Sequence, residues 1–225
     1  MQTDFRLFGP LHLAILAATP ASALLLARSV RRGRLPAQRV SRTLGLLLAG
    51  NELIWYAWRL RTEGWRFPEG LPLQLCDLAL WMTVLSALRR SAWSYELAYF
   101  AGLGGSTMAL ITPALWAPTF SYPTIYFFVA HGGVVATVLF LAIAGLARPR
   151  PGCWWRAFLL LNGYTTLVGL FNVAFGTNYM FLCRKPPTPS LLDYMGPWPV
   201  YIVVGEVFAV AVFALLYLPF AKRAR

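Results

Sequence analysis

Acidic residues are scarce in this chain, and charged residues of either sign are few for its length. Its 225 residues include only 8 Asp and Glu, and charged residues make up 12% of the sequence, against about 25% in an ordinary globular protein. Hydrophobic residues reach 58%, so too few charges remain to cover a water-exposed surface. The 3 cysteines leave at least one thiol unpaired, which excludes a disulfide-bonded framework. The composition predicts an integral membrane protein.

Three long stretches contain no charged side chain, namely residues 7–27, 97–147 and 157–183. A spanning helix needs about 20 apolar residues to cross a bilayer core of about 30 Å, so each stretch is long enough. The second stretch must cross twice. Pro113 and Pro118 divide it, because proline lacks the N–H donor that a continuing helix needs.

We therefore predict an all-α, polytopic membrane protein in which seven transmembrane helices form a single domain over residues 1–225. The predicted spans are residues 8–27, 43–60, 71–88, 94–112, 122–147, 155–175 and 197–219.

Basic residues alternate between the two sides of this arrangement. One side carries Arg28, Arg31, Arg32, Arg34, Arg39, Arg42, Arg89, Arg90, Arg148, Arg150, Arg156, Lys222, Arg223 and Arg225. The other carries Arg6, Arg59, Arg61, Arg66, Arg184 and Lys185. The positive-inside rule places the larger group in the cytoplasm, with the N-terminus out and the C-terminus in. We expect a multi-pass protein of the cell membrane.

The net charge of +12 would suit a nucleic-acid partner if it formed one surface. Because the charges lie between apolar spans, we expect no nucleic acid. The arginine-rich cytoplasmic face is instead expected to contact anionic lipid headgroups.

Ionisable side chains inside the predicted spans are costly in lipid, so they mark candidate functional positions. These are Glu52, Cys76, Asp77, His131 and Glu206. At 1.5 Å per residue, Cys76 lies about 7 Å below the outer boundary, and Glu52, His131 and Glu206 lie roughly 12 to 14 Å below it. We expect these helices to bring the groups together in the outer half of the membrane. Glu96 is expected to be separate.

A histidine in the first span, His12, lies near the outer end of that span. Imidazole is half apolar and half polar, so this position predicts a side chain at the membrane interface.

If Cys76 and His131 face each other, the imidazole can take the thiol proton and the thiolate can attack an ester carbonyl to form an acyl thioester. Asp77 or Glu52 would orient the imidazole, and Asn178 or backbone amides would stabilise the oxyanion. Structural interpretations stay open, since a cysteine can fill space, a histidine can bridge helices, and a buried carboxyl can pair or protonate.

A proline-rich segment, residues 176–199 (GTNYMFLCRKPPTPSLLDYMGPWP), is predicted to form a stiffened outer loop before the last span. Long ordered loops often cover a site. Arg184 and Lys185 would hold a lipid phosphate there, or serve as ordinary interfacial charges.

Four segments resemble those of the bacterial YwaF-type integral membrane proteins: LPLQLCDL (71–78), YELAYFAGLGGSTMALITP (95–113), AHGG (130–133) and NYMFLCRKPPTPSLLDYMGPWPVY (178–201). The similarity covers nearly the whole chain. That family is similar in turn to the eukaryotic transmembrane protein 164 group, which implies a Cys/His-dependent acyltransferase acting on phospholipids, with His131 as the histidine. The eukaryotic Pro-Cys-His pattern would align its cysteine with Leu73. Cys76 lies three residues later, on nearly the same helix face.

The sequence thus favours a membrane lipid acyltransferase or acyl-hydrolase that uses no cofactor and no metal, with membrane phospholipids as its partners. A transporter, or a lipid- or small-molecule-binding protein without catalysis, is the alternative, because it would also place polar residues at this depth. In that case Glu52 and Glu206 would matter more than Cys76. Retinal chemistry is excluded, since Lys185 and Lys222 lie outside the spans.

Overall fold

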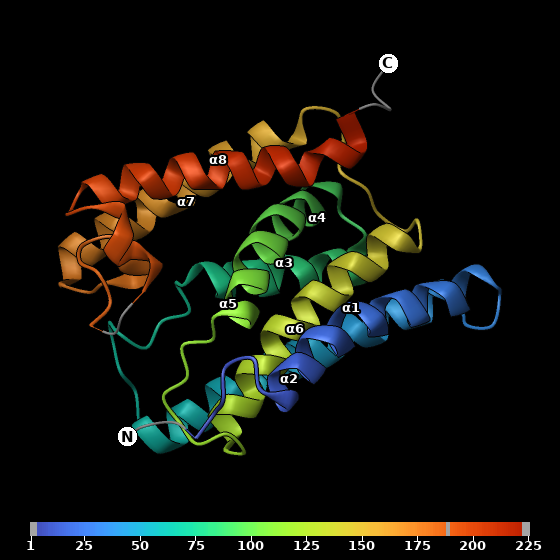
Figure 1. The fold of residues 1–225 in the computed structure, drawn as a ribbon, viewed down its shortest axis with the longest axis horizontal. Coiled ribbons are helices and arrows are strands. Elements are labelled where there is room, and N and C mark those ends of the chain that lie inside the picture. Colours follow the sequence, from blue (N-terminus) through green and yellow to red (C-terminus); the bar gives the residue numbers. More distant parts are fainter. Residues whose placement is uncertain (1–3, 188–189, 222–225) are drawn as a thin grey trace.

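The computed structural model describes residues 4–187 and 190–221, and the regular elements in these ranges are all helices (Figure 1). They are α1 (Pro10–Arg31), α2 (Ala37–Glu63), α3 (Leu75–Arg89), α4 (Ala92–Leu97), η1 (Ala98–Ser106), α5 (Thr107–Ile111), α6 (Tyr122–Ile143), α7 (Cys153–Phe175), η2 (Tyr179–Phe181), η3 (Leu191–Met195) and α8 (Val200–Ala221). A π-helix, η1, joins α4 and α5 into one rod, while η2 and η3 are short 3-10 turns. The predicted all-α class is confirmed.

Four of these helices are long and apolar enough to cross a membrane: α1, α6, α7 and α8. The other three predicted spans fall on α2, on α3 and on the rod formed by α4, η1 and α5. With 15 residues, α3 is about 22 Å long, shorter than a hydrocarbon core of about 30 Å. The chain is a membrane protein whose third rod is unusually short.

Local sequence explains where several helices begin and end. Proline stands in the first turn of α1 and of α6, where its missing N–H has no partner to lose. Gly176 ends α7 in the left-handed region with φ 69°, a conformation that glycine adopts without strain. These residues set the starts of α1 and α6 and the end of α7.

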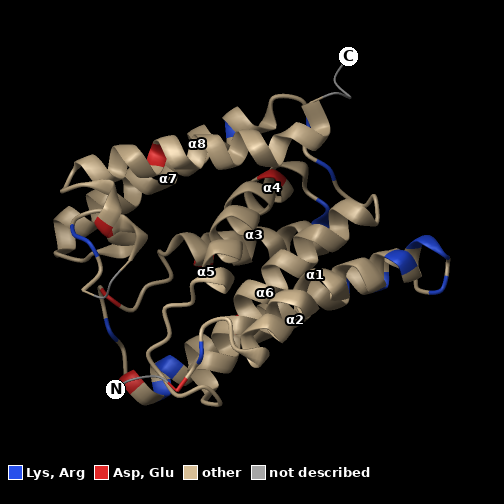
Figure 2. Ribbon diagram, in the orientation of Figure 1, with Lys and Arg blue, Asp and Glu red and all other residues tan. Residues whose placement is uncertain are grey.

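Successive rods run back and forth, so the loops gather at two ends of the molecule (Figure 1). We call the end with the α1–α2, α3–α4 and α6–α7 loops the arginine-rich end, because the ribbon segments coloured blue for Lys and Arg are concentrated there (Figure 2). The opposite end holds the α2–α3, α5–α6 and α7–α8 loops. Lys222, Arg223 and Arg225, which the sequence assigns to the first group, lie outside the described residues.

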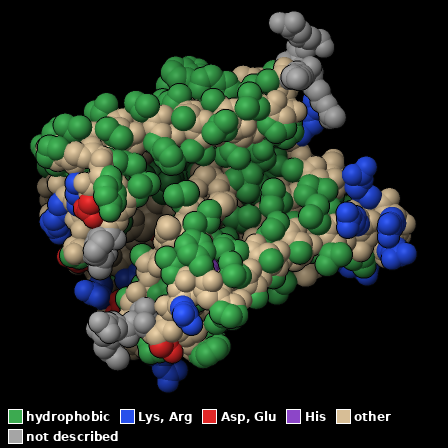
Figure 3. Space-filling model, in the orientation of Figure 1, with side chains coloured by type: hydrophobic (Ala, Val, Ile, Leu, Met, Phe, Trp, Pro, Cys, Tyr) green, Lys and Arg blue, Asp and Glu red, His purple; other side chains and the backbone are tan. Residues whose placement is uncertain are grey.

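The helices from α1 to α6 form the main bundle, and the α7–α8 hairpin packs against it chiefly through α4 and η1 (Figure 1). Small residues let the rods approach closely, as is typical within membranes. Gly102 of η1 lies against Val134 of α6, and Gly133 of α6 lies against Leu48 of α2. Hydrophobic side chains also cover most of the outer face between the two ends (Figure 3).

Polar side chains tie the rods together at both ends. At the arginine-rich end, Glu96 is 3% exposed and accepts hydrogen bonds from Arg150 at 2.6 and 2.9 Å and from Arg156 at 3.4 Å. At the opposite end, the Asp4 carboxylate accepts hydrogen bonds from the hydroxyl and the backbone N–H of Thr119, which lower the pKa of that carboxyl. Glu96 thus belongs to an ion pair with Arg150 and Arg156 at the arginine-rich end.

The position of His12 corrects the prediction of an interfacial side chain, because this residue is completely buried. Its Nδ1 accepts the backbone N–H of Phe8 at 2.9 Å, so Nε2 carries the hydrogen and donates to the carbonyl oxygen of Leu110 at 2.7 Å. The ring also packs against Phe5 and Phe128. Position along one helix could not reveal that α5 ends beside this ring.

The close approach at Gly102 predicts a stability change that distinguishes two glycines of the same π-helix. A Cβ at Gly102 would lie 2.9 Å from Val134 Cγ1, whereas one at Gly104 would lie 3.5 Å from Val212 Cγ1, an ordinary contact. We expect Gly102→Ala to lower stability by about 1 to 3 kcal/mol through overpacking. Gly104→Ala should be neutral or slightly stabilising, because alanine favours helices. Thermal unfolding in detergent measures both, and equal melting temperatures would contradict this packing.

Candidate functional site

A small polar cavity lies among α2, α3, η1 and α6. The polar residues that line it are Glu52, Cys76, Asp77, Ser106, Tyr126 and His131. The apolar residues of the lining are Leu80, Ala130 and Val134. Its volume is about 20 Å³, enough for about one water molecule. Four of the five ionisable residues singled out in the sequence therefore share one cavity, although they come from three separate helices.

The imidazole of His131 is held in one orientation by its own helix. Its Nδ1 lies 2.8 Å from the backbone carbonyl oxygen of Phe127, and its ring packs against the Phe127 ring with centroids 4.3 Å apart. A carbonyl can only accept, so Nδ1 carries the hydrogen. In the neutral ring, Nε2 is then the nitrogen with the free lone pair, which is the form that a general base requires.

The carboxylate of Glu52 is fully buried and only partly satisfied. Oε2 accepts the hydroxyl of Tyr126 at 2.7 Å, while Oε1 has no hydrogen-bond partner among the described residues. An unpaired buried oxygen is costly. Glu52 also lines the polar cavity, so it adds an incompletely satisfied acceptor to that lining.

Two supporting side chains make structural hydrogen bonds instead of the expected catalytic ones. Asp77 accepts the backbone N–H of Gln74 at 2.9 Å and so caps the start of α3. Asn178 accepts the N–H groups of Cys183 and Arg184 and donates to the Arg184 carbonyl, which folds the loop on itself. The hydrogen bond that orients His131 comes from a backbone carbonyl, not from a carboxylate.

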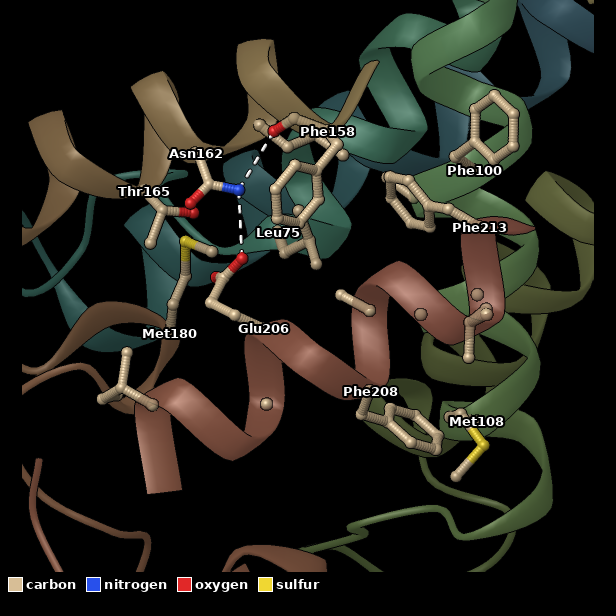
Figure 4. A pocket seen from close by; sticks show the side chains of 18 of the residues that line it. Leu75, Phe100, Met108, Phe158, Asn162, Thr165, Met180, Glu206, Phe208 and Phe213 are labelled. Atoms are coloured by element: carbon tan, nitrogen blue, oxygen red, sulfur yellow. Dashed lines mark hydrogen bonds between the residues drawn. The ribbon is translucent and has the colours of Figure 1, made fainter. Parts of the chain in front are cut away.

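A second and much larger cavity, which we call the cleft, separates the α7–α8 hairpin from η1 and α5 (Figure 4). Its volume is about 310 Å³, and its walls are mostly apolar. Glu206 of α8 lies in this cleft, where its Oε2 accepts the side-chain amide of Asn162 at 3.0 Å. The sequence placed Glu206 in the same group as Cys76 and His131, and this prediction was wrong because α8 stands apart from α2 and α6.

The α7–α8 loop docks on the segment that precedes α3. The Tyr179 hydroxyl donates to the carbonyl of Pro68 at 2.7 Å and accepts the N–H of Leu71 at 2.9 Å. The N–H of Met180 donates to Gln74 Oε1 at 2.9 Å. The described part of the loop therefore packs on the residues just before α3 and leaves Cys76 exposed.

The two basic residues of that loop differ in their surroundings. Arg184 is exposed, while Lys185 is partly buried and places its ammonium 5.7 Å from the centre of the Tyr201 ring. Neither lines the polar cavity or the cleft.

Comparison with known families identifies the chain as a whole. A family model described as the TMEM164 family matches residues 7–217, a range that includes both cavities. The chain belongs to the TMEM164 family. No curated protein and no solved structure matches it.

Several lining residues of this TMEM164-family protein had no clear signal in the sequence. Asn162 is uncharged, so a search for ionisable groups within spans passed over it. Tyr126 lies near a span end, where aromatic residues are ordinarily interfacial anchors. Ser106 follows two glycines in a segment typical of tight helix packing. A search for every hydrogen-bonding side chain within the spans would have found Asn162 and Ser106.

The bond between Gln74 and the α7–α8 loop predicts a change in protease sensitivity. Removing Gln74 Oε1 costs about 1 kcal/mol of loop docking, so Gln74→Ala should raise trypsin cleavage after the exposed Arg184 by about fivefold. Gln38→Ala, at the arginine-rich end, is the control. Unchanged cleavage rates in detergent would show that the Gln74–Met180 contact does not hold the loop.

Proposed function

We propose that this TMEM164-family protein is an integral membrane lipid acyltransferase or acyl-hydrolase that acts on phospholipid esters. Cys76 is the nucleophile and His131 the general base. The observation that carries the proposal is that these residues, from separate helices, line one cavity in which His131 keeps Nε2 as an acceptor. Family membership supports it further.

The chemistry follows the roles of a thiol and an imidazole. Nε2 of His131 takes the proton of the Cys76 thiol, and the thiolate forms a bond to the ester carbonyl carbon. The ester C–O bond breaks, and the leaving alcohol takes the proton from the imidazolium. Water or a lipid hydroxyl then attacks the thioester, giving a free fatty acid or a new ester and restoring the thiol.

The size of the cavity determines which part of the substrate reaches it. A volume of about 20 Å³ cannot hold a lipid, so only the reacting carbonyl approaches. Cys76 is exposed, which lets that carbonyl reach the sulfur from the membrane side. The short α3 places its first turn, with Cys76, below the level at which a full-length span would begin.

The chemistry can be tested by intact mass spectrometry of purified protein incubated with phosphatidylglycerol. We expect an acyl adduct on Cys76 that is lost in Cys76→Ala. In His131→Ala its formation should slow by about 100-fold or more, because general base catalysis typically contributes that much.

Cys183→Ala is the matched control, because this partly buried cysteine lies outside the polar cavity. Adduct formation should be unchanged in that variant. An adduct that persists in Cys76→Ala, or that maps to Cys183, would exclude the proposed nucleophile.

A second function, lipid binding or transport without catalysis, is favoured by one specific observation. The cleft has a much larger volume than the polar cavity and holds Glu206, while Cys76 does not line it. If this function holds, Glu206→Gln changes lipid binding while no adduct forms on Cys76.

We also infer the membrane arrangement in which this chemistry takes place. Seven spans cross the cell membrane with the N-terminus out and the C-terminus in, so the polar cavity lies in the outer half of the bilayer. The arginine-rich face then meets anionic lipids of the cytoplasmic leaflet. We assign the chain to the bacterial YwaF-type branch of its family on the four segments quoted above.

This arrangement predicts opposite labelling at the two ends in a variant with alanine at all three native cysteines. Glu69→Cys in the α2–α3 loop should react with a membrane-impermeant maleimide in intact cells. Arg34→Cys in the α1–α2 loop should react only after the membrane is opened. Labelling of both sites in intact cells, or the reverse pattern, would contradict the orientation.

A further inference from the structure

The cleft has the lining of a site for a long hydrocarbon. Its walls come from the start of α3, from η1, α5, α7 and α8, and from the α7–α8 loop, and they include Phe100, Phe158, Leu161, Leu192, Val212 and Phe213. Figure 4 shows Phe100, Phe158 and Phe213 around the cleft, with Met108 and Phe208 next to each other at one edge. Such a surface favours an apolar ligand, since it offers few hydrogen-bonding groups.

The dimensions of the cleft suit one chain of a lipid. The α8 residues that line it run from Tyr201 to Phe213, a rise of about 18 Å. That length is about half of a hydrocarbon core of about 30 Å, so it corresponds to one leaflet. A volume of about 310 Å³ is at the low end for small-ligand pockets, which suits one chain and not a whole phospholipid.

The edge of the cleft opens toward the region where lipid chains lie. Met108 is 37% exposed and Phe208 is 44% exposed, although both line the cleft. Both are exposed apolar side chains, one on α5 and one on α8. A chain can therefore pass from the bilayer into the cleft between α5 and α8 without crossing a charged surface.

The cleft and the polar cavity share a thin wall. Leu75 lines the cleft, and Cys76, the next residue, lines the polar cavity. On the other rod, Gly105 lines the cleft and Ser106 lines the polar cavity. The wall therefore consists of the first turn of α3 and the end of η1.

We propose that the cleft binds one acyl chain of a membrane phospholipid and holds that lipid beside Cys76. The Asn162–Glu206 pair supplies the polar contact within an otherwise apolar site. Binding of the acyl chain is inferred from the geometry of the cleft alone. The role of the cleft in delivering an ester to Cys76 rests on the proposed function.

The experiment uses phosphatidylglycerol that carries a photoreactive diazirine on one acyl chain, incorporated with the full chain into lipid nanodiscs. After illumination, mass spectrometry of peptides locates the label. We expect labelling of α5 and of the α8 residues that line the cleft, well above labelling of the exposed faces of α1 and α2.

Two glycines provide a matched pair of variants. Gly205 of α8 lines the cleft and Gly163 of α7 does not, and an added Cβ meets no atom within 4 Å at either position. Gly205→Phe fills the cleft and should reduce cleft labelling at least fivefold, while Gly163→Phe should leave it unchanged. If Gly205→Phe does not fold, Ala209→Leu provides the same test, because Ala209 also lines the cleft and leucine is smaller than phenylalanine.

Label spread evenly over the apolar face, or cleft labelling equal in Gly205→Phe and Gly163→Phe, overturns the proposal. Labelling by a diazirine fatty acid but not by the phospholipid overturns the assignment to phospholipid. Because labelling needs no turnover, it is repeated in Cys76→Ala. Cleft labelling without any acyl adduct on the native chain refutes the proposed catalysis alone, while an adduct without cleft labelling refutes this inference alone.

Discussion

A polar group within lipid must find its hydrogen-bond partner inside the protein, and this constraint explains most of the features of the structure. Water competes for such groups in a soluble protein but is missing from the bilayer core. His12 therefore turns inward to the carbonyl of Leu110, and the buried Glu96 of α4 pairs with Arg150 of the α6–α7 loop. The same constraint concentrates Glu52, Asp77 and the His131 ring between three helices.

Composition and charge distribution were sufficient to predict the all-α class and the four helices that are long and apolar enough to cross a membrane. Runs without charge locate α1, α6 and α7, because a lipid-facing helix cannot carry many ionised side chains. The proline-rich break after Thr112 was equally clear, since α5 ends at Ile111 and α6 begins at Tyr122. What the sequence did not reveal is that the α7–α8 hairpin stands apart from the main bundle.

The site was predicted in part, for reasons that differ between residues. Depth along a helix can be counted from a span boundary, and Glu52, Cys76 and His131, which this count grouped in the outer half of the membrane, line the same cavity. Depth says nothing about the direction in which a helix faces, so Glu206 was grouped with them although it lies in the cleft. Asp77 and Asn178 form hydrogen bonds with nearby backbone groups, in a helix cap and in a loop. Such hydrogen bonds depend on backbone geometry that a residue pattern does not contain.

The π-helical segment η1 is nine residues long and separates the cleft from the polar cavity. A π-helix closes its hydrogen bonds one residue later than an α-helix, which makes it an insertion that can be taken up or released by neighbouring turns. If η1 rewound as an α-helix, each side chain beyond the change would turn by about 100° around the rod axis. Ser106 would then leave the polar cavity, and Gly105 would no longer line the cleft. The helical winding of η1 therefore determines which of its residues line the polar cavity and which line the cleft.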